Sequence, residues 1–383
     1  MTSCRFSFAF SQLKSLNNHK TNVLLNKQRS EGYQVVSPLL AGGGGFGGGG
    51  GSSSKAKQKG NKKSDSSSSK STISAKKKLQ IQEKLIKSYG GDVAKGTEQR
   101  IQKAMSSLPP HIQEVAALYK KINQWDASMA SLSLMQQSQL PQHDIDGAKR
   151  AREELKIYYE KYNLNDQYMH NLFQQMTWDA SADAKAAKAI IGQMPQHIEE
   201  RVNKACDIIA ECVKRAGRKE GRCLDVGCGH GTLIPSFINA GIYPGQIKGV
   251  DLSPEMIRNA EERYRGPEFI ATDFLQLVED DQYDGVMFCS SLHDLPDMKS
   301  SLFKAARLLR SGGKLVIIHA QGGAHVDSQH KANPLLVRRG LPSGDELIQW
   351  AEEMLLEVEV LPAAPSSKQD KEEGYLAVLR KKS

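Results

Sequence analysis

The pattern of hydrophobic and polar positions divides the chain into two parts. Between residues 79 and 220, glycines are few and apolar side chains recur at helical spacing, which predicts successive amphipathic helices. From residue 222 onward, short apolar runs alternate with amphipathic segments. Strands that alternate with helices are typical of an α/β fold with a mostly parallel sheet.

Seven segments of this second part carry the strand pattern. They are residues 223–226, 247–251, 268–274, 283–291, a fifth strand that starts within 310–319, 356–361 and 374–380. Helices are expected at residues 298–309 and 345–355. Gly312 and Gly313 follow the first of these helices, and we expect them to close it before the fifth strand begins.

The segment 223–233 (CLDVGCGHGTL) predicts a buried strand, a tight glycine turn and the start of a helix. Its three glycines let the backbone pass close to a bound ligand, and the helix points free N–H groups into the turn. The dinucleotide fingerprint G-x-G-x-x-G would need glycine where Thr232 stands, so the spacing here is G-x-G-x-G. The segment therefore predicts a nucleotide-type cofactor site of another kind.

With Asp225 two residues before its first glycine, this segment resembles motif I of the class I S-adenosylmethionine-dependent methyltransferases. Further segments match the family in the right order. Asp251 ends the second strand, Asp273 and Phe274 end the third, and residues 292–319 are similar to the corresponding stretch of the type 11 group. The resemblance extends over residues 222–319.

The resemblance implies a Rossmann-like, seven-stranded, mostly parallel sheet in a methyltransferase domain at residues 219–383. The last strand is antiparallel and pairs with the strand before it. S-adenosylmethionine is the implied cofactor. An acid such as Asp251 at the end of the second strand can accept hydrogen bonds from both ribose hydroxyls, although it could also cap the next helix. The implied cofactor-binding residues are Asp225, Gly227, Cys228, Gly229, Gly231, Asp251, Leu252, Met256, Asp273, Phe274, Cys289 and Ser290.

Methyl transfer of this kind mainly requires that donor and acceptor be aligned and that water be excluded. A general base helps only where the acceptor carries a proton that is hard to lose. The candidates are His293, just after the fourth strand, and His319, at the end of the fifth. Each could instead be a histidine satisfied by backbone hydrogen bonds. Asp294 and Asp297 are expected to cap the helix that follows.

The helical region 79–218 is expected to act as a lid or as a docking surface. Family members often carry an N-terminal helix that covers the cofactor, and we place this lid at residues 165–218. The polar connection at residues 319–342 contains His325, His330, Arg338 and Arg339. It is long for a connection, and in this fold such a segment caps the substrate pocket.

The positive charge of the chain is confined to its N-terminal part. Residues 1–88 hold 16 Lys and Arg against 3 Asp and Glu, whereas the remainder holds 36 against 40, so the net charge of +9 gives no argument for nucleic-acid binding by the catalytic body. Residues 1–40, which begin with thirty residues without an acid, are expected to be an organellar transit peptide, plastid or mitochondrial, or else an ordinary disordered tail. Residues 41–78 are a Gly/Ser/Lys-rich disordered linker.

The six cysteines are expected to be reduced thiols, because none stands in a C-x-x-C motif and no cluster has zinc spacing. No metal site is therefore predicted. No transmembrane helix is predicted either, because no apolar run approaches the length of a membrane span. Three functions remain open. The first is a methyltransferase for a small-molecule acceptor, the second a protein or RNA methyltransferase that docks through its helical region, and the third a non-catalytic, cofactor-binding assembly factor.

Overall fold

The computed structural model describes residues 74–130, 132–192, 194–217, 220–279 and 282–382. The expected transit peptide and most of the linker lie outside the described residues. The end of the linker, however, is helical, because helix α2 (Ala75–Ser88) begins inside it. The side chain of Ser74 caps this helix by accepting a hydrogen bond from the Lys77 backbone N–H.

Seven strands form one sheet in the order β3-β2-β1-β4-β5-β7-β6. β7 is antiparallel to β5 and β6, and the other pairs are parallel. This confirms the predicted Rossmann-like sheet with an antiparallel last strand. The strands are β1 (Cys223–Val226), β2 (Ile247–Asp251), β3 (Glu268–Ala271), β4 (Tyr283–Cys289), β5 (Leu309–His319), β6 (Leu356–Val360) and β7 (Tyr375–Lys381).

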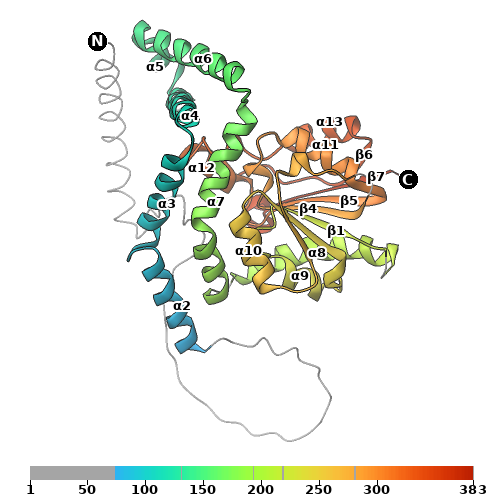
Figure 1. The fold of residues 1–383 in the computed structure, drawn as a ribbon. Coiled ribbons are helices and arrows are strands. Elements are labelled where there is room, and N and C mark those ends of the chain that lie inside the picture. Colours follow the sequence, from blue (N-terminus) through green and yellow to red (C-terminus); the bar gives the residue numbers. More distant parts are fainter. Residues whose placement is uncertain (1–73, 131, 193, 218–219, 280–281, 383) are drawn as a thin grey trace, which may run out of the picture.

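Helices cover both faces of this sheet (Figure 1). On one face, α8 (Gln196–Ala216) and α9 (Ile234–Asn239) pack against the strands, with Ile209 and Phe237 fully buried. On the other face, α11 (Met298–Leu308) and α13 (Gly344–Glu353) bury Leu302 and Leu347. The central strands β1 and β4 are almost entirely buried because both of their faces are covered, and most of their side chains are apolar. The remaining elements of this part are α10 (Pro254–Arg263), α12 (Gly323–Ala332), α14 (Lys368–Glu373) and the short 3-10 helices η2 (Pro244–Gln246), η3 (Phe274–Gln276) and η4 (Leu292–Asp294).

The glycines after α11 do not close that helix as expected. β5 begins at Leu309, directly after the helix, and Gly312 and Gly313 lie inside the strand. Between two paired positions, β4 advances from Tyr283 to Gly285 while β5 advances from Leu309 to Lys314, so β5 bulges out of register. Gly312 has a φ of +76°, which a residue with a Cβ adopts only with strain.

The connection after β5 is more ordered than the sequence pattern suggested, because it contains helix α12. Asp370 of α14 accepts hydrogen bonds from the backbone N–H groups of Gly323 (2.7 Å) and Ala324 (3.2 Å). A carboxylate from a distant part of the chain thus caps the first turn of α12. No local sequence signal marks this cap.

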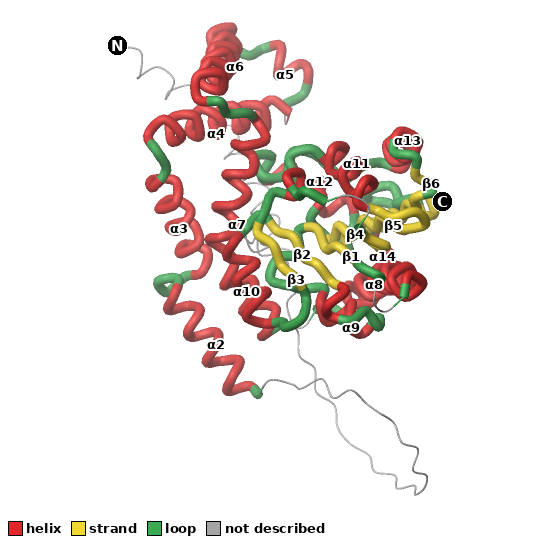
Figure 2. Tube along the Cα trace, turned by 45° about the vertical axis from the view of Figure 1, so that its right-hand side comes forward, coloured by secondary structure: helices red, strands yellow, loops and turns green. Residues whose placement is uncertain are grey.

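The predicted helical region is present and forms a column of helices beside the sheet (Figures 1 and 2). α7 contacts α2, α3 and, in the sheet-bearing part, α10. Tyr119 of α4 and Phe173 of α7 stack in a core of their own, with ring centroids 5.7 Å apart. The helices besides α2 and α8 are α3 (Val93–Ser107), α4 (Pro110–Ala130), α5 (Leu134–Ser138), α6 (Gln142–Tyr162) and α7 (Asp166–Ile191).

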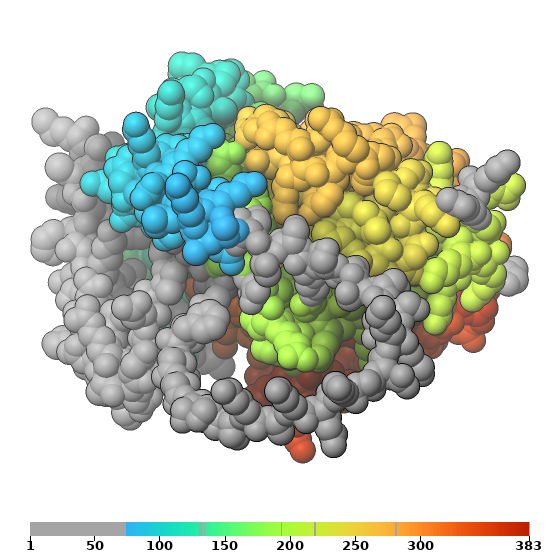
Figure 3. Space-filling view, turned by 90° about the horizontal axis from the view of Figure 1, so that it is seen from below, coloured from blue at the N-terminus to red at the C-terminus, as the bar shows by residue number. Residues whose placement is uncertain are grey.

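Of the two helices in the expected lid range, only α7 lies beside the carboxyl ends of the strands, because α8 packs on a face of the sheet. Figure 3 shows the blue helices of the N-terminal region next to the green-to-orange surface of the sheet-bearing part. No described helix combines the length and the apolar composition needed to cross a lipid bilayer.

Candidate active site

The glycine loop, residues 227–231, follows β1 and contacts the neighbouring segments on both of its sides. The N–H of Gly227 donates to the Val250 carbonyl at 2.8 Å. A Cβ on Gly227 would lie 2.4 Å from Cβ of Ser291, so only glycine lets the loop pack against the segment after β4. A Cβ on Gly229 would meet no atom within 4 Å, and this glycine therefore faces open space where a ligand can approach.

Asp251, at the end of β2, holds the glycine loop in place. Its Oδ2 accepts from the Gly229 N–H and its Oδ1 from the Ser253 N–H, both at 2.9 Å. Ser253, not Asp251, is the N-cap of α10, since its side chain accepts from the Met256 N–H. Burial raises the pKa of Asp251 to about 6, although the two backbone donors act in the opposite direction.

Asp225 is a buried carboxyl group with an unsatisfied oxygen. Its side chain is 1% exposed, and its Oδ2 has no hydrogen-bond partner among the described residues. Burial, and then the nearby charge of Asp251, raise the pKa of Asp225 to about 8. A buried acceptor without a partner is costly unless a ligand satisfies it. The position beside the glycine loop suits a ligand that carries an ammonium group.

Asp273, for which the family resemblance implies a contact with the adenine amino group of the cofactor, lies beneath helix α7. Its Oδ1 accepts from the Leu275 N–H, which makes it the N-cap of η3. Its Oδ2 accepts from Gln167 Nε2 at 3.0 Å and from Asn171 Nδ2 at 2.9 Å, and both of these amides belong to α7. α7 thus reaches over the end of β3, where the family resemblance places the base of the cofactor.

Two other expected cofactor residues contribute their side chains to the interior. The ring of Phe274 packs edge-on against Phe288, with ring centroids 5.6 Å apart, inside the main core. Met256 is 3% exposed. The ring of Phe274 is therefore part of the main core, whereas the family resemblance implies that this residue flanks the base of the cofactor.

The remaining expected cofactor residues lie along the same edge of the sheet. Leu252 and Cys289 are half-buried, and Cys228 is buried in the loop. Gly231, with a φ of +78°, ends the loop. Ser290 has a φ of +54° and donates its N–H to the Ile318 carbonyl. The structure therefore gathers all of these residues at the carboxyl ends of β1, β2 and β4.

Comparison with known proteins agrees with this geometry. Residues 224–317 match the family model described as "Methyltransferase domain". The chain carries a class I S-adenosylmethionine-dependent methyltransferase domain. The matched segment runs from β1 to β5 and so contains the glycine loop, Asp251 and the segment after β4.

Individual relatives share the methyltransferase domain at moderate identity. A ubiquinone biosynthesis O-methyltransferase of Xanthomonas oryzae is 30% identical over 148 residues, which cover 37% of this chain and 54% of that protein. A demethylmenaquinone methyltransferase of Staphylococcus aureus is 27% identical over 151 residues, which cover 36% of this chain and 63% of that protein. This chain therefore matches less than two thirds of the length of either relative.

A solved structure is also similar to this chain. The crystal structure of magnesium protoporphyrin IX methyltransferase from Synechocystis PCC 6803 with bound SAH has 17% sequence identity to it and a TM-score of 0.41. The alignment covers 56% of this chain and 100% of that chain.

Helix α7 is attached to the methyltransferase domain by acids that the sequence reading did not single out. Asp179 accepts hydrogen bonds from the Ser253 hydroxyl and, at 3.4 Å, from the Glu255 N–H. One turn later, Asp183 forms an ion pair of 2.8 Å with Arg258 of α10. These contacts hold α7 beside the start of α10, close to Asp251.

Another face of α7 carries Gln174, Trp178 and Lys185 at helical spacing. Lys185 Nζ lies 4.3 Å from the centre of the Trp178 ring. Burial lowers the pKa of Lys185, while the charge of Asp294, after β4, raises it. The charge of Lys185 also helps to lower the pKa of His230 in the glycine loop. Lys185 is therefore a partly desolvated cation between the glycine loop and the segment after β4.

The two histidines proposed as bases lie together with a third. The ring centroids of His293 and His319 are 5.2 Å apart, and those of His319 and His325 are 5.4 Å apart. We name these three residues the histidine cluster. His293 is 5% and His319 is 3% exposed, yet neither Nδ1 has a hydrogen-bond partner in the described part of the chain, and the same holds for Nε2 of His325. These nitrogens are therefore not satisfied by the backbone.

The two acids after β4 have different positions. Asp297 is the N-cap of α11 and accepts from the Ser300 N–H at 3.1 Å, as predicted. Asp294 is not a cap of that helix, because η4 ends at Asp294 before the helix begins. Its Oδ1 lies 3.7 Å from Nε2 of His293. Burial raises the pKa of Asp294, and the neighbouring His293 acts in the opposite direction.

Arg338, in the segment after α12, connects the helical region to the methyltransferase domain. Its Nε donates to His170 Nδ1 at 3.0 Å, and its Nη2 donates to the Tyr119 hydroxyl at 2.6 Å. Its Nη1 forms an ion pair of 2.6 Å with Asp166. The other ring nitrogen of His170 lies 2.9 Å from the Asp294 carbonyl oxygen. Arg338 was expected only as part of a polar loop, and the structure makes it a junction of α4, α7 and η4.

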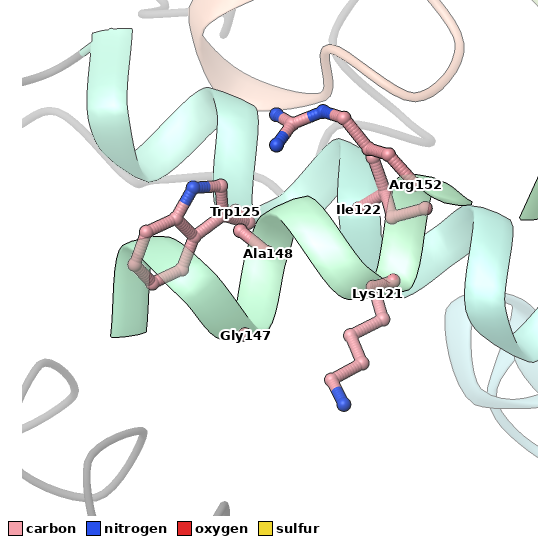
Figure 4. A pocket seen from close by; sticks show the side chains of 7 residues that line it. Lys121, Ile122, Trp125, Gly147, Ala148 and Arg152 are labelled. Carbon is pink, nitrogen blue, oxygen red and sulfur yellow. The ribbon is translucent and has the colours of Figure 1, made fainter. Parts of the chain in front are cut away.

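A separate small pocket lies between α4 and α6 (Figure 4). Trp125 and the stem of Arg152 line it, and it contains no residue of the predicted site. The pocket belongs to the helical region and is distinct from the carboxyl edge of the sheet.

Proposed function

We propose that this protein is an S-adenosylmethionine-dependent methyltransferase with a small-molecule acceptor. One observation carries the proposal. Asp251 holds the glycine loop through the Gly229 N–H, and the buried Asp225 beside that loop keeps an unsatisfied oxygen. A loop that leaves open space at Gly229, with an acceptor for a cation next to it, fits a nucleoside with an amino-acid tail.

We assign each of these residues to one part of S-adenosylmethionine. The free oxygen of Asp225 would accept from the ammonium group, and Lys185 would face the carboxylate. Each oxygen of Asp251 accepts one backbone hydrogen bond and keeps a lone pair for a ribose hydroxyl. Asp273, with the amides of α7, lies where the base is expected. The bound cofactor would supply an electrophilic methyl group.

We further propose that α7 is the lid over this site. Gln167 and Asn171 reach one end of the cofactor position and Asp179 reaches its middle. A helix in this position would exclude water from the reacting groups. Side chains along α7 would then have to rearrange for the cofactor to enter or leave.

A small molecule is the proposed acceptor for two reasons. The names of the similar Xanthomonas and Staphylococcus proteins refer to ubiquinone biosynthesis and demethylmenaquinone, both of which concern small molecules. The excess of positive charge that could attract nucleic acid belongs to residues 1–88, which precede the methyltransferase domain in the sequence.

We also propose that residues 1–40 direct the protein to an organelle, either the plastid or the mitochondrion. The first thirty residues contain no acid and five basic residues, which suits a transit peptide. Fusion of residues 1–78 to a fluorescent protein tests this. Import with removal of the fused segment is the expected result, and a diffuse cytosolic signal would contradict it.

Calorimetric titration of the full-length protein with S-adenosylhomocysteine tests the main proposal. The expected outcome is saturable one-to-one binding in the micromolar range, and incubation with labelled S-adenosylmethionine should then transfer label to a small molecule of an organellar extract. A folded protein that binds neither S-adenosylhomocysteine nor S-adenosylmethionine would rule the proposal out. Label recovered only in protein or RNA would overturn the small-molecule assignment.

A further inference from the structure

We propose that the histidine cluster and Asp294 form the acceptor site, and that this site takes a neutral acceptor with an ionisable hydroxyl group, such as a phenol, for O-methylation. This inference rests on the proposed methyltransferase function and adds the chemical class of the acceptor and the residues that receive it.

The histidine cluster is placed where an acceptor can meet the methyl donor. His293 follows β4, His319 ends β5, and His325 lies in the first turn of α12. The segment after β4 touches the glycine loop, because Cβ of Ser291 occupies the space that a side chain on Gly227 would need. The cluster is thus only two residues away from a direct contact with the cofactor loop.

The cluster lacks partners that its burial demands. Three of its ring nitrogens and Oε1 of Gln329, one turn beyond His325 on α12, have no hydrogen-bond partner among the described residues. Buried polar atoms in folded proteins are nearly always paired. In the described part of the chain, no group of His, Cys, Asp or Glu side chains is arranged to hold a metal ion. A ligand with a hydroxyl group can supply the partner that these atoms lack.

Electrostatics favour a hydroxyl over a charged acceptor group. Burial lowers the pKa of His319 and His325, and the charge of His293 acts in the same direction. Neutral imidazoles offer lone pairs and N–H groups but no positive charge for a phosphate or a carboxylate. The nearby Arg338 is paired with Asp166. A hydroxyl can donate to one ring nitrogen and accept from another.

His293 is the group placed to take the hydroxyl proton. Asp294 lies beside its Nε2 at 3.7 Å and leaves Nδ1 unpaired. A carboxylate on one side of an imidazole fixes the orientation of the ring. Asp294 and His319 lie directly beside His293. Two further titratable groups are near: His325, whose pKa His293 lowers, and Lys185, whose pKa Asp294 raises. Asp294 is therefore a positioning residue for the base.

The hydroxyl oxygen forms a bond to the methyl carbon while the carbon–sulfur bond of the donor breaks and its electron pair stays on sulfur. The hydroxyl proton passes to Nδ1 of His293, which becomes an imidazolium. The products are a methyl ether, S-adenosylhomocysteine and a proton that His293 later releases to solvent.

Catechol, with aniline as its amine counterpart, tests the inference. The complex with S-adenosylhomocysteine should bind catechol in a calorimetric titration, and the protein supplied with S-adenosylmethionine should convert catechol to 2-methoxyphenol. His293→Gln should reduce kcat for catechol on the order of 100-fold or more while S-adenosylhomocysteine affinity is retained. Asp294→Asn should reduce kcat by at least about tenfold and leave KM for catechol nearly unchanged.

The control is His197→Gln, at an exposed position of α8 outside the histidine cluster. It should behave as the unmodified protein. Methylation of aniline but not of catechol, no binding of catechol to the complex, or an Asp294→Asn variant that changes only thermal stability would each overturn the inference. Intact binding of S-adenosylhomocysteine in these cases would leave the methyltransferase proposal standing.

Discussion

Gly229 donates its backbone N–H to Oδ2 of Asp251 over 2.9 Å, and this bond joins the glycine loop after β1 to the end of β2. The other oxygen of Asp251 holds the Ser253 N–H at the start of α10. One carboxylate thus sets the position of two backbone segments that border the cofactor site. Asp251 therefore shapes this edge of the sheet, in addition to the ligand contact that we propose for it.

Removal of this carboxylate should weaken cofactor binding. For Asp251→Ala we expect the free energy of S-adenosylhomocysteine binding to become less favourable by roughly 1–3 kcal/mol, the range for loss of a charged hydrogen-bond partner. Calorimetry measures this, and hydrogen exchange at Gly229 should accelerate in parallel. Asp207→Ala, at an exposed position of α8, is the matched control and should bind as before. Unchanged affinity in a folded Asp251→Ala protein would contradict the assignment.

Cofactor binding should depend on pH through Asp225. The pKa of this buried carboxyl is raised to about 8, so below that pH the group is mostly protonated in the free protein. An ammonium group that binds beside it favours the ionised form, and binding must then release a proton. We expect the affinity for S-adenosylhomocysteine to rise as the pH increases from about 6 to about 8, by at most roughly tenfold per pH unit.

Calorimetry in two buffers of different ionisation enthalpy counts the released proton directly. Asp225→Asn cannot ionise, so this variant should bind more weakly and lose most of the pH dependence in the same window. A pH dependence that persists unchanged in Asp225→Asn would assign the proton to another group.

The sheet and the glycine loop could be predicted because their signals are local. Residues 223–233 contain a buried strand, its glycines and the following helix in a single run, and strand periodicity located the other strands. Features that depend on distant residues could not be predicted in this way. α12 is capped by Asp370, and the bulge in β5 is defined by its register with β4.

The same limit applies to the site residues. Asp251 and Asp225 could be found from their spacing to the glycines. The sequence predicts Asp294 only as a helix cap. Its contact with His293 could not be predicted, because the turn of η4 and not a sequence motif brings the two residues together. Lys185 lies in a helix whose face toward the site becomes apparent only when α7 is packed against the domain.

Replacement of Lys185 should affect binding of the amino-acid tail of the cofactor but not binding of its nucleoside. A partly desolvated ammonium above the Trp178 ring can face the carboxylate of the amino-acid tail. Lys185→Met should weaken S-adenosylhomocysteine binding on the order of tenfold, as for loss of one charged hydrogen bond. It should leave the affinity for methylthioadenosine, which lacks the amino-acid tail, unchanged. Lys188→Met, exposed on the same helix, is the control. Equal losses for both ligands would mean that Lys185 supports the fold instead.

Arg338 and Arg339 are adjacent in the sequence, but their replacement should have very different effects on local stability. Arg338 donates to Tyr119 and to the fully buried His170, so Arg338→Met leaves buried polar atoms without partners. We expect a loss of about 1–3 kcal/mol in the stability of the contact between α4, α7 and the methyltransferase domain. Hydrogen exchange followed by mass spectrometry should show faster exchange in α4 and α7 while the central strands stay protected. Arg339→Met removes an exposed ion pair with Glu346. It should change neither the stability of this contact nor the hydrogen exchange of α4 and α7 by a measurable amount. Faster exchange across the whole sheet would show that Arg338 stabilises the entire domain rather than this junction.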